Sequence, residues 1–191
     1  AGTQQATESW KWEKVITTDT AEVTICLDIS SRIMSIPKEQ SRILVGREDH
    51  VRKASEALGN GKDGARVVLT GMQGAGKDEI AARVVRDERV LRCQEIMFAE
   101  WIQGSTASLL RVQLLGAFHA QFPHIFSDSD GEEKSFERVR RWLRSNTGWF
   151  FVIEDATLET LRILSDWFPE GRGRLLITTQ MNREVPLLQR Y

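Results

Sequence analysis

A short glycine-rich loop between an apolar run and a helix-forming segment constrains the fold of this chain more than any other feature. Residues 71–77 read GMQGAGK and fit the pattern G-x-x-x-x-G-K. The preceding run RVVLTG is typical of a buried parallel strand, and the apolar spacing after Lys77 predicts a helix to about Leu91. Glycines in this setting allow successive backbone N–H groups to point into one hollow, and the helix N-terminus favours an anion. The sequence therefore predicts a phosphate-binding loop.

The alternative is a glycine-rich turn that carries an exposed lysine, and the flanking strand and helix make it the less favoured interpretation. In the functional interpretation, Lys77 reaches the phosphates of a nucleotide as a point charge. The residues predicted to bind the nucleotide in this segment are Gly71, Met72, Gln73, Gly74, Ala75, Gly76, Lys77, Asp78 and Glu79.

The loop departs from its usual pattern at Asp78, where a Ser or Thr hydroxyl normally holds magnesium. A carboxylate about 4 Å from a phosphate charge is repelled by roughly 4 kcal/mol at an effective dielectric of 20. Interaction with the helix N-terminus returns only about 0.3–1 kcal/mol. We therefore expect Asp78 to point away from the phosphates, to pair with a basic group, or to bind the metal directly.

Strand-like and helix-like segments alternate along most of the chain. Strands are expected at about 66–71, 95–102, 149–155, 173–180 and 184–189, and helices at about 48–58, 77–91, 106–121, 136–143 and 158–168. This alternation predicts an α/β fold with a mostly parallel sheet built from right-handed βαβ units. The helix at 106–121 is apolar around most of its surface, which predicts deep burial. The acidic residues 123–135 are expected to form a loop.

Polar side chains end two of the predicted strands. Glu154 and Asp155 follow four apolar residues, and a nucleoside triphosphatase needs one carboxylate for magnesium and often another to orient water. The alternative is that these acids only end a strand and begin a turn. Thr178 and Thr179 lie near the end of the segment LLITTQ, on the edge where open α/β sheets bind ligands, and a hydroxyl there could contact a γ-phosphate. A threonine that simply favours a strand explains Thr178 equally well.

These segments together resemble the STAND class of P-loop NTPases and, within it, the NB-ARC-type nucleotide-binding domains of NLR-like receptors. The segment ILVGRED is similar to the V-G-R-E motif of that family, whose backbone lies against the adenine. The resemblance therefore implies nucleotide contacts from Val45, Gly46 and Arg47. The glycine loop, WFFVIEDA and GRLLITTQ resemble the loop, the L-L-V-L-D-D/N strand and the T-T-R strand of the family, in the same order over residues 43–183.

The resemblance implies a three-layer sandwich with the strand order 5-1-4-3-2, in which the strand at 173–180 lies between those at 66–71 and 149–155. It also implies an ATP/ADP-dependent switch of an NLR-like signalling protein in innate immunity, which forms a homo-oligomer in its full-length active state. In such receptors an effector domain usually precedes this domain, and a helical subdomain, a winged helix and repeats follow it.

Three positions depart from the family pattern. Asp78 replaces the magnesium-binding hydroxyl, Glu154 stands in place of the usual Asp, and Gln180 stands in place of an arginine, with Arg183 close by. All three concern the metal or the γ-phosphate, so we expect ATP or ADP binding with weak or absent hydrolysis. Magnesium, if bound, is expected on Asp78 and Glu154.

Two other functions stay open. One is a P-loop ATPase or small-molecule kinase with genuine turnover, in which Glu154 and Asp155 are catalytic and Asp155 activates the nucleophile. The acidic character of residues 128–135 argues against a kinase, since a kinase lid is rich in arginine. The other is a binding module whose loop has lost its nucleotide.

Charge and composition restrict the partners. The 191 residues carry a net charge of −1, which gives no general attraction to nucleic acid or to an anionic membrane. No apolar run approaches the roughly 20 residues that span a bilayer, and Cys26 and Cys93 match no metal or redox spacing. We expect a cytoplasmic protein with an N-terminal arm at 1–42, which contains a possible strand at 22–29, and a nucleotide-binding domain at 43–191.

Overall fold

The structure is a computed structural model. It describes residues 46–59, 64–87, 90, 96–127 and 129–180. The predicted N-terminal arm at 1–42, with its possible strand, lies outside the described residues. Among the helices of the described part, none is both long and apolar enough to cross a membrane.

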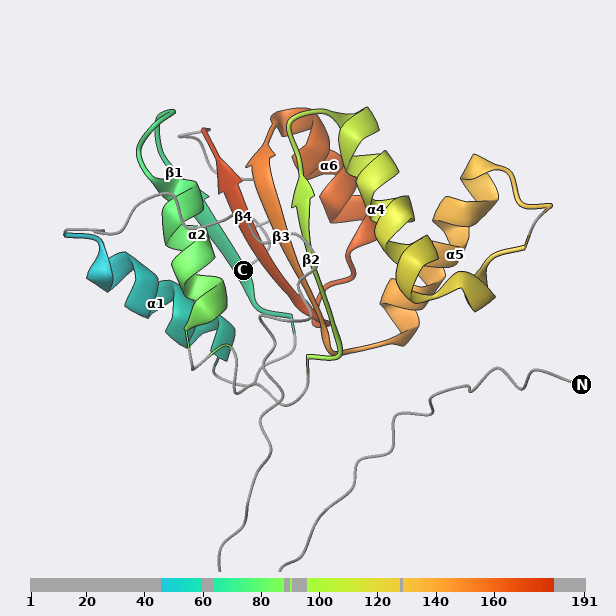
Figure 1. The fold of residues 1–191 in the computed structure, drawn as a ribbon, viewed down its shortest axis with the longest axis horizontal. Coiled ribbons are helices and arrows are strands. Elements are labelled where there is room, and N and C mark those ends of the chain that lie inside the picture. Colours follow the sequence, from blue (N-terminus) through green and yellow to red (C-terminus); the bar gives the residue numbers. More distant parts are fainter. Residues whose placement is uncertain (1–45, 60–63, 88–89, 91–95, 128, 181–191) are drawn as a thin grey trace, which may run out of the picture.

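Four parallel strands form the central sheet (Figure 1). They are β1 (Arg66–Thr70), β2 (Phe98–Gln103), β3 (Trp149–Ala156) and β4 (Arg174–Thr179). Their order is β1-β4-β3-β2, so β4 lies between the loop strand and β3, where the predicted order places it. The α/β class and the parallel sheet are confirmed. The fifth strand of the predicted order, at 184–189, lies outside the described residues.

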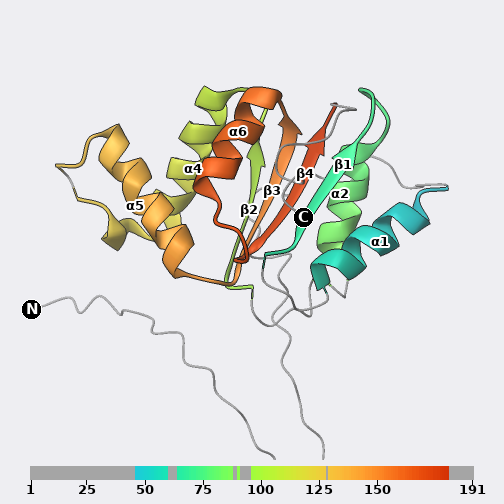
Figure 2. The same cartoon turned by 180° about the vertical axis from the view of Figure 1, so that it is seen from behind.

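Helices cover both faces of this sheet (Figure 1, Figure 2). One face carries α1 (Glu48–Gly59) and α2 (Lys77–Arg86), and the other carries α4 (Ala107–Gln121), the short 3-10 helix η2 (Pro123–Ile125), α5 (Glu132–Ser145) and α6 (Leu158–Trp167). Alternate residues of each strand point to opposite faces. In β3, Phe151 and Ile153 therefore pack under α4, α5 and α6, while Phe150 and Val152 pack under α1 and α2. Two apolar cores result, one on each side of the sheet.

The predicted deep burial of the helix at 106–121 is wrong. In α4 only Leu110, Leu114 and Phe118 are buried, and Val112 is 66% exposed. The helix lies over β2, the edge strand of the described sheet, so only one side of it faces the core. An apolar sequence around the whole helix does not reveal that its outer side has no neighbour among the described elements.

Other departures from the predicted elements are local. The acidic stretch expected as a loop contains η2 and the first turn of α5, and the Asp130 carboxylate pairs with Arg138 of that helix at 2.5 Å. Helix α2 ends at Arg86, earlier than predicted, because Asp87 takes an extended conformation there. In α1 the buried residues are Ala54, Ser55 and Leu58, while Ala57 is exposed.

Glu100 makes the stability of this fold depend on pH. It lies on β2, opposite Phe151, and is only 6% exposed, and this burial raises its pKa from 4.5 to about 7. The folded state thus holds the proton more tightly than the unfolded chain. The stabilising contribution is complete below pH 4.5 and is lost as the pH rises through about 7. Glu100→Gln, compared with the wild type by urea unfolding from pH 4.5 to 8, should remove this decline, and identical pH profiles would contradict the assignment.

Candidate functional site

The glycine loop joins β1 to α2 in the geometry that the sequence predicts. Gly74 and Gly76 adopt left-handed backbone angles, with φ of +76° and +79°, which cost glycine nothing but strain other residues. The Ala75 N–H donates to the Met72 carbonyl at 3.2 Å, which closes the turn. Helix α2 begins at Lys77 directly after Gly76, so its unpaired N–H groups and positive dipole end lie at the loop.

Lys77 lies folded against this loop. Its side chain is only 5% exposed, and its Nζ donates to the Met72 carbonyl at 2.9 Å. The ammonium therefore stays beside the backbone groups that would surround a phosphate. A bound phosphate would offer Lys77 a charged acceptor in place of a neutral carbonyl, and hydrogen bonds to charged groups are the stronger ones.

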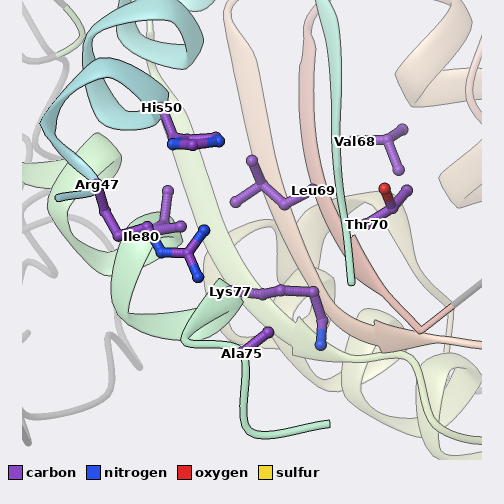
Figure 3. Close-up of a pocket in the computed structure, with 8 residues that line it drawn as sticks. All are labelled: Arg47, His50, Val68, Leu69, Thr70, Ala75, Lys77 and Ile80. Carbon is purple, nitrogen blue, oxygen red and sulfur yellow. The ribbon is translucent and has the colours of Figure 1, made fainter. Parts of the chain in front are cut away.

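A cavity of about 280 Å³ opens beside the loop (Figure 3). It is lined by Arg47, His50, Val68, Leu69, Thr70, Ala75, Lys77 and Ile80. Arg47, His50 and Ile80 lie on one side of the cavity and the β1 residues on the other, with Lys77 next to the loop (Figure 3). No carboxylate is among the lining residues. A lining that combines apolar side chains with the basic Arg47, His50 and Lys77 suits a flat ring joined to an anionic group.

Asp78 does not point freely into solvent. Its Oδ1 accepts a hydrogen bond of 2.9 Å from the hydroxyl of Thr178, which is fully buried at the end of β4. The same Thr178 hydroxyl accepts from the Asp155 backbone N–H at 2.9 Å. One hydroxyl thus links α2, β4 and β3 at the carboxyl edge of the sheet. The sequence did not predict this contact, because it joins residues 100 positions apart.

Asp155 and Glu154 lie where β3 departs from regular pairing. Ile153 pairs with Ile177 and Ala156 with Thr179, so the two acids oppose the single residue Thr178. Asp155 has φ of +53°, a left-handed value that is uncommon outside glycine and marks a strained position. This bulge places both acids opposite Thr178, at the carboxyl end of β4.

The Glu154 carboxylate is held by two donors from β2. Trp101 Nε1 donates to Glu154 Oε2 at 2.7 Å, and Gln103 Nε2 donates to the same oxygen at 2.5 Å. Burial raises the pKa of Glu154, and the negative charges of Asp78 and Asp155 raise it further, while the two hydrogen bonds oppose the rise.

The structure brings most of the predicted site residues to one edge of the sheet. Hydrogen bonds join Asp78, Thr178 and Asp155 there, Lys77 and Glu154 directly precede two of them in sequence, and Gly46 and Arg47 directly precede α1. Val45 lies outside the described residues.

Among the other loop residues, the side chain of Met72 is 76% exposed, so only its backbone contributes to the loop hydrogen bonds. Glu79 turns away along α2 and pairs with Arg83 at 3.3 Å. Gln180 follows β4 and is exposed, and Arg183 lies outside the described residues.

Several residues at the site were not predicted. His50 follows Arg47 by one helical turn, so the helix starting at Glu48 could have indicated it. Trp101 and Gln103 are two residues apart on β2, so their side chains lie on the same face of the sheet. Only the pairing of β2 with β3 shows that the acid they bind is Glu154.

The donor set fits a hard cation. Asp78 and Glu154 offer carboxylate oxygens, and magnesium is commonly held by one or two carboxylates together with substrate phosphates. Within the described residues, no group of three or more His, Cys, Asp or Glu is arranged to hold a metal by itself. The residues therefore fit an ion that arrives with a nucleotide better than a permanent metal centre.

Comparison with known proteins supports the fold. The crystal structure of Cdc6p from Pyrobaculum aerophilum is similar to this chain, with a TM-score of 0.55 and 19% sequence identity over 86% of the chain. The chain spans 48%, about half, of that protein. At this identity the likeness shows the fold alone, an α/β fold with a parallel sheet. No protein-family model and no curated protein matches the sequence.

Removing the Thr178 hydroxyl should destabilise this edge of the sheet. Thr178→Val takes away the donor to Asp78 and leaves the Asp155 N–H without its acceptor. An unsatisfied buried group costs about 1–3 kcal/mol, so the free energy of unfolding should fall by that amount. Thr178→Ser keeps the hydroxyl and is the matched control. Urea unfolding at pH 7 makes the measurement, and equal losses in the two variants would show that the hydroxyl is unimportant.

Proposed function

We propose that this chain binds ATP or ADP at the glycine loop. The observation that carries the proposal is the position of Lys77 at the start of α2, between the two left-handed glycines of the loop and the cavity beside β1. The loop N–H groups, the helix end and Lys77 suit the phosphates. The cavity suits the base, with Arg47 and His50 at its rim and Val45 and Gly46 contributing backbone as the V-G-R-E resemblance implies.

The altered acids favour a switch over a turnover enzyme. Asp78 stands in place of a magnesium-binding hydroxyl, and its carboxylate is engaged by Thr178. Placing Asp78, Glu154 and a γ-phosphate together collects like charges, which costs roughly 4 kcal/mol for each pair at 4 Å. The domain therefore holds nucleotide more readily than it hydrolyses it. The alternative, genuine turnover as an ATPase or small-molecule kinase, would use Glu154 and Asp155 as the catalytic acids.

Magnesium belongs to this proposal as a companion of the nucleotide. Asp78 and Glu154 would hold it, and when bound it offsets the negative charge of phosphates and carboxylates. Thr178 of β4, whose hydroxyl donates to Asp78, then joins the metal-binding acid to the sheet.

The resemblance to STAND proteins supplies the wider role. We propose a nucleotide-dependent switch of an NLR-like, cytoplasmic signalling protein in innate immunity, with exchange of ADP for ATP promoting a homo-oligomer of the full-length chain. The four motifs follow one another over residues 43–183 in the order of that family, which supports this role, since a general nucleotide site would require only the loop and one acid.

Replacing Lys77 tests nucleotide binding itself. Lys77→Ala should lower the affinity for ADP about 10- to 100-fold, because a hydrogen bond to a charged phosphate is lost. Lys134→Ala, which removes an exposed lysine from α5 on the other face of the sheet, is the control and should bind like the wild type. Calorimetric titration with ADP makes the measurement, supported by chromatography of nucleotide released from the denatured protein. A wild type that neither carries nor binds nucleotide would refute the proposal.

Replacing Asp78 tests the switch. Asp78→Thr restores the usual hydroxyl and removes one negative charge, so phosphate release from ATP with magnesium should rise. Glu159→Gln removes an exposed acid from the first turn of α6 and serves as the charge control. Unchanged release in Asp78→Thr would contradict the role given to Asp78, and a wild type that already turns over rapidly would favour the ATPase or kinase alternative.

A further inference from the structure

Two side chains of the edge strand β2 meet one oxygen of Glu154. Trp101 and Gln103 stand two residues apart, so both project from the same face of the strand. The register pairs Gln103 with Glu154 across the sheet. Their N–H groups reach Glu154 Oε2 at 2.7 and 2.5 Å, respectively. Both donors use Oε2, and among the described residues no hydrogen bond to Oε1 is formed.

The backbone around Glu154 is fixed as well. The Gly104 N–H, directly after β2, donates to the Glu154 carbonyl at 2.6 Å. A Cβ on Gly104 would lie 2.7 Å from Ile153 Cγ2, so glycine is needed for this close approach. The Gln103 N–H donates in turn to Gln113 Oε1 of α4 at 2.7 Å. The end of β2 is therefore anchored to β3 and to α4, and its two donors have little freedom to move.

A carboxylate on a free side chain rotates about three single bonds, and two donors on one oxygen restrict that rotation. Partners of this kind, which orient a ligand without touching the metal, typically change metal affinity 10- to 100-fold when they are removed. Glu154 directly precedes Asp155, whose N–H donates to the Thr178 hydroxyl, and that hydroxyl donates in turn to Asp78. The two acids are thus each oriented by a separate hydrogen-bond donor set.

We propose that Trp101 and Gln103 are positioning residues that hold Glu154 Oε2, so that Glu154 Oε1 serves a divalent cation bound together with the nucleotide at the glycine loop. This inference rests on the proposed function, because it assigns a role within the nucleotide site. It gives the edge strand β2, which carries no loop residue, a part in the affinity for the metal–nucleotide complex.

The test separates affinity with magnesium from affinity without it. ADP is titrated into the wild type, Trp101→Phe and Gln103→Leu, in magnesium and in EDTA. The ADP affinity in EDTA should stay within about twofold of the wild type. The magnesium gain, which is the ratio of the ADP affinity in magnesium to that in EDTA, should fall about tenfold in each variant. A residue that only stabilises the fold would lower both affinities together.

Trp149→Phe is the matched control. Trp149 also lies in a strand, and its indole N–H donates to the Leu143 carbonyl at 3.3 Å. Trp149→Phe therefore removes one indole donor, as Trp101→Phe does. It stands at the opposite end of β3 from Glu154, five residues away, or about 16 Å along an extended strand. The magnesium gain should be unchanged in this variant.

A spectroscopic measurement follows the contact itself. The chain has six tryptophans, so the indole N–H region of an ¹H–¹⁵N spectrum is simple, and the signal lost in Trp101→Phe is that of Trp101. Replacing Glu154 with Leu should shift this signal, and adding magnesium to the ADP complex of the wild type should shift it again. The Trp149 signal should respond to neither change.

Each result is decisive. A magnesium gain in Trp101→Phe and Gln103→Leu equal to that of the wild type overturns the inference, and so does an equal loss in Trp149→Phe. A wild type that binds ADP equally well in magnesium and in EDTA also overturns it but leaves nucleotide binding intact. A wild type that binds no ADP in either condition refutes the proposed function, and the inference falls with it.

Discussion

The position of β4 between β1 and β3 is the constraint on which the candidate site depends. Parallel strands end at a common edge, so this order places Thr178 of β4 between the loop that follows β1 and the acids that end β3. The hydrogen bonds from Thr178 to Asp78 and from Asp155 to Thr178 then become possible. Without that insertion, the loop and the two acids would be separate features of two distant segments.

The regular parts of this arrangement are readable from the sequence. The strands are short apolar runs and the loop is a fixed pattern, so local propensity and hydrophobic period indicate them. The resemblance then supplies the position of β4, which periodicity alone does not determine. Helix α4 shows the limit, since its apolar character is the same on the buried side of Leu114 and on the exposed side of Val112. Burial depends on what lies beside a helix, and that information is not local.

The site shows the same division. Lys77 and the loop glycines were predicted because their chemistry depends on adjacent residues. The partners of Asp78 and Glu154 were not, because each comes from a different strand and is specified by register. A one-residue change in the β2–β3 pairing would turn Trp101 and Gln103 to the other face of the sheet. The sequence shows which side chains are able to make such hydrogen bonds, but the strand order and register determine which pairs form.

The two altered acids are better understood together than singly. At the loop, Asp78 adds a negative charge where a phosphate would bind, and Thr178 is the neutral donor that holds it. At β3, Glu154 is one methylene longer than the aspartate of the family that the sequence resembles, and Trp101 and Gln103 of β2 hold its carboxylate. A longer side chain has more conformations to lose, so a defined position needs more donors. The two donors on β2 therefore suit the longer side chain at residue 154. Both Asp78 and Glu154 depend on residues of neighbouring strands for their orientation.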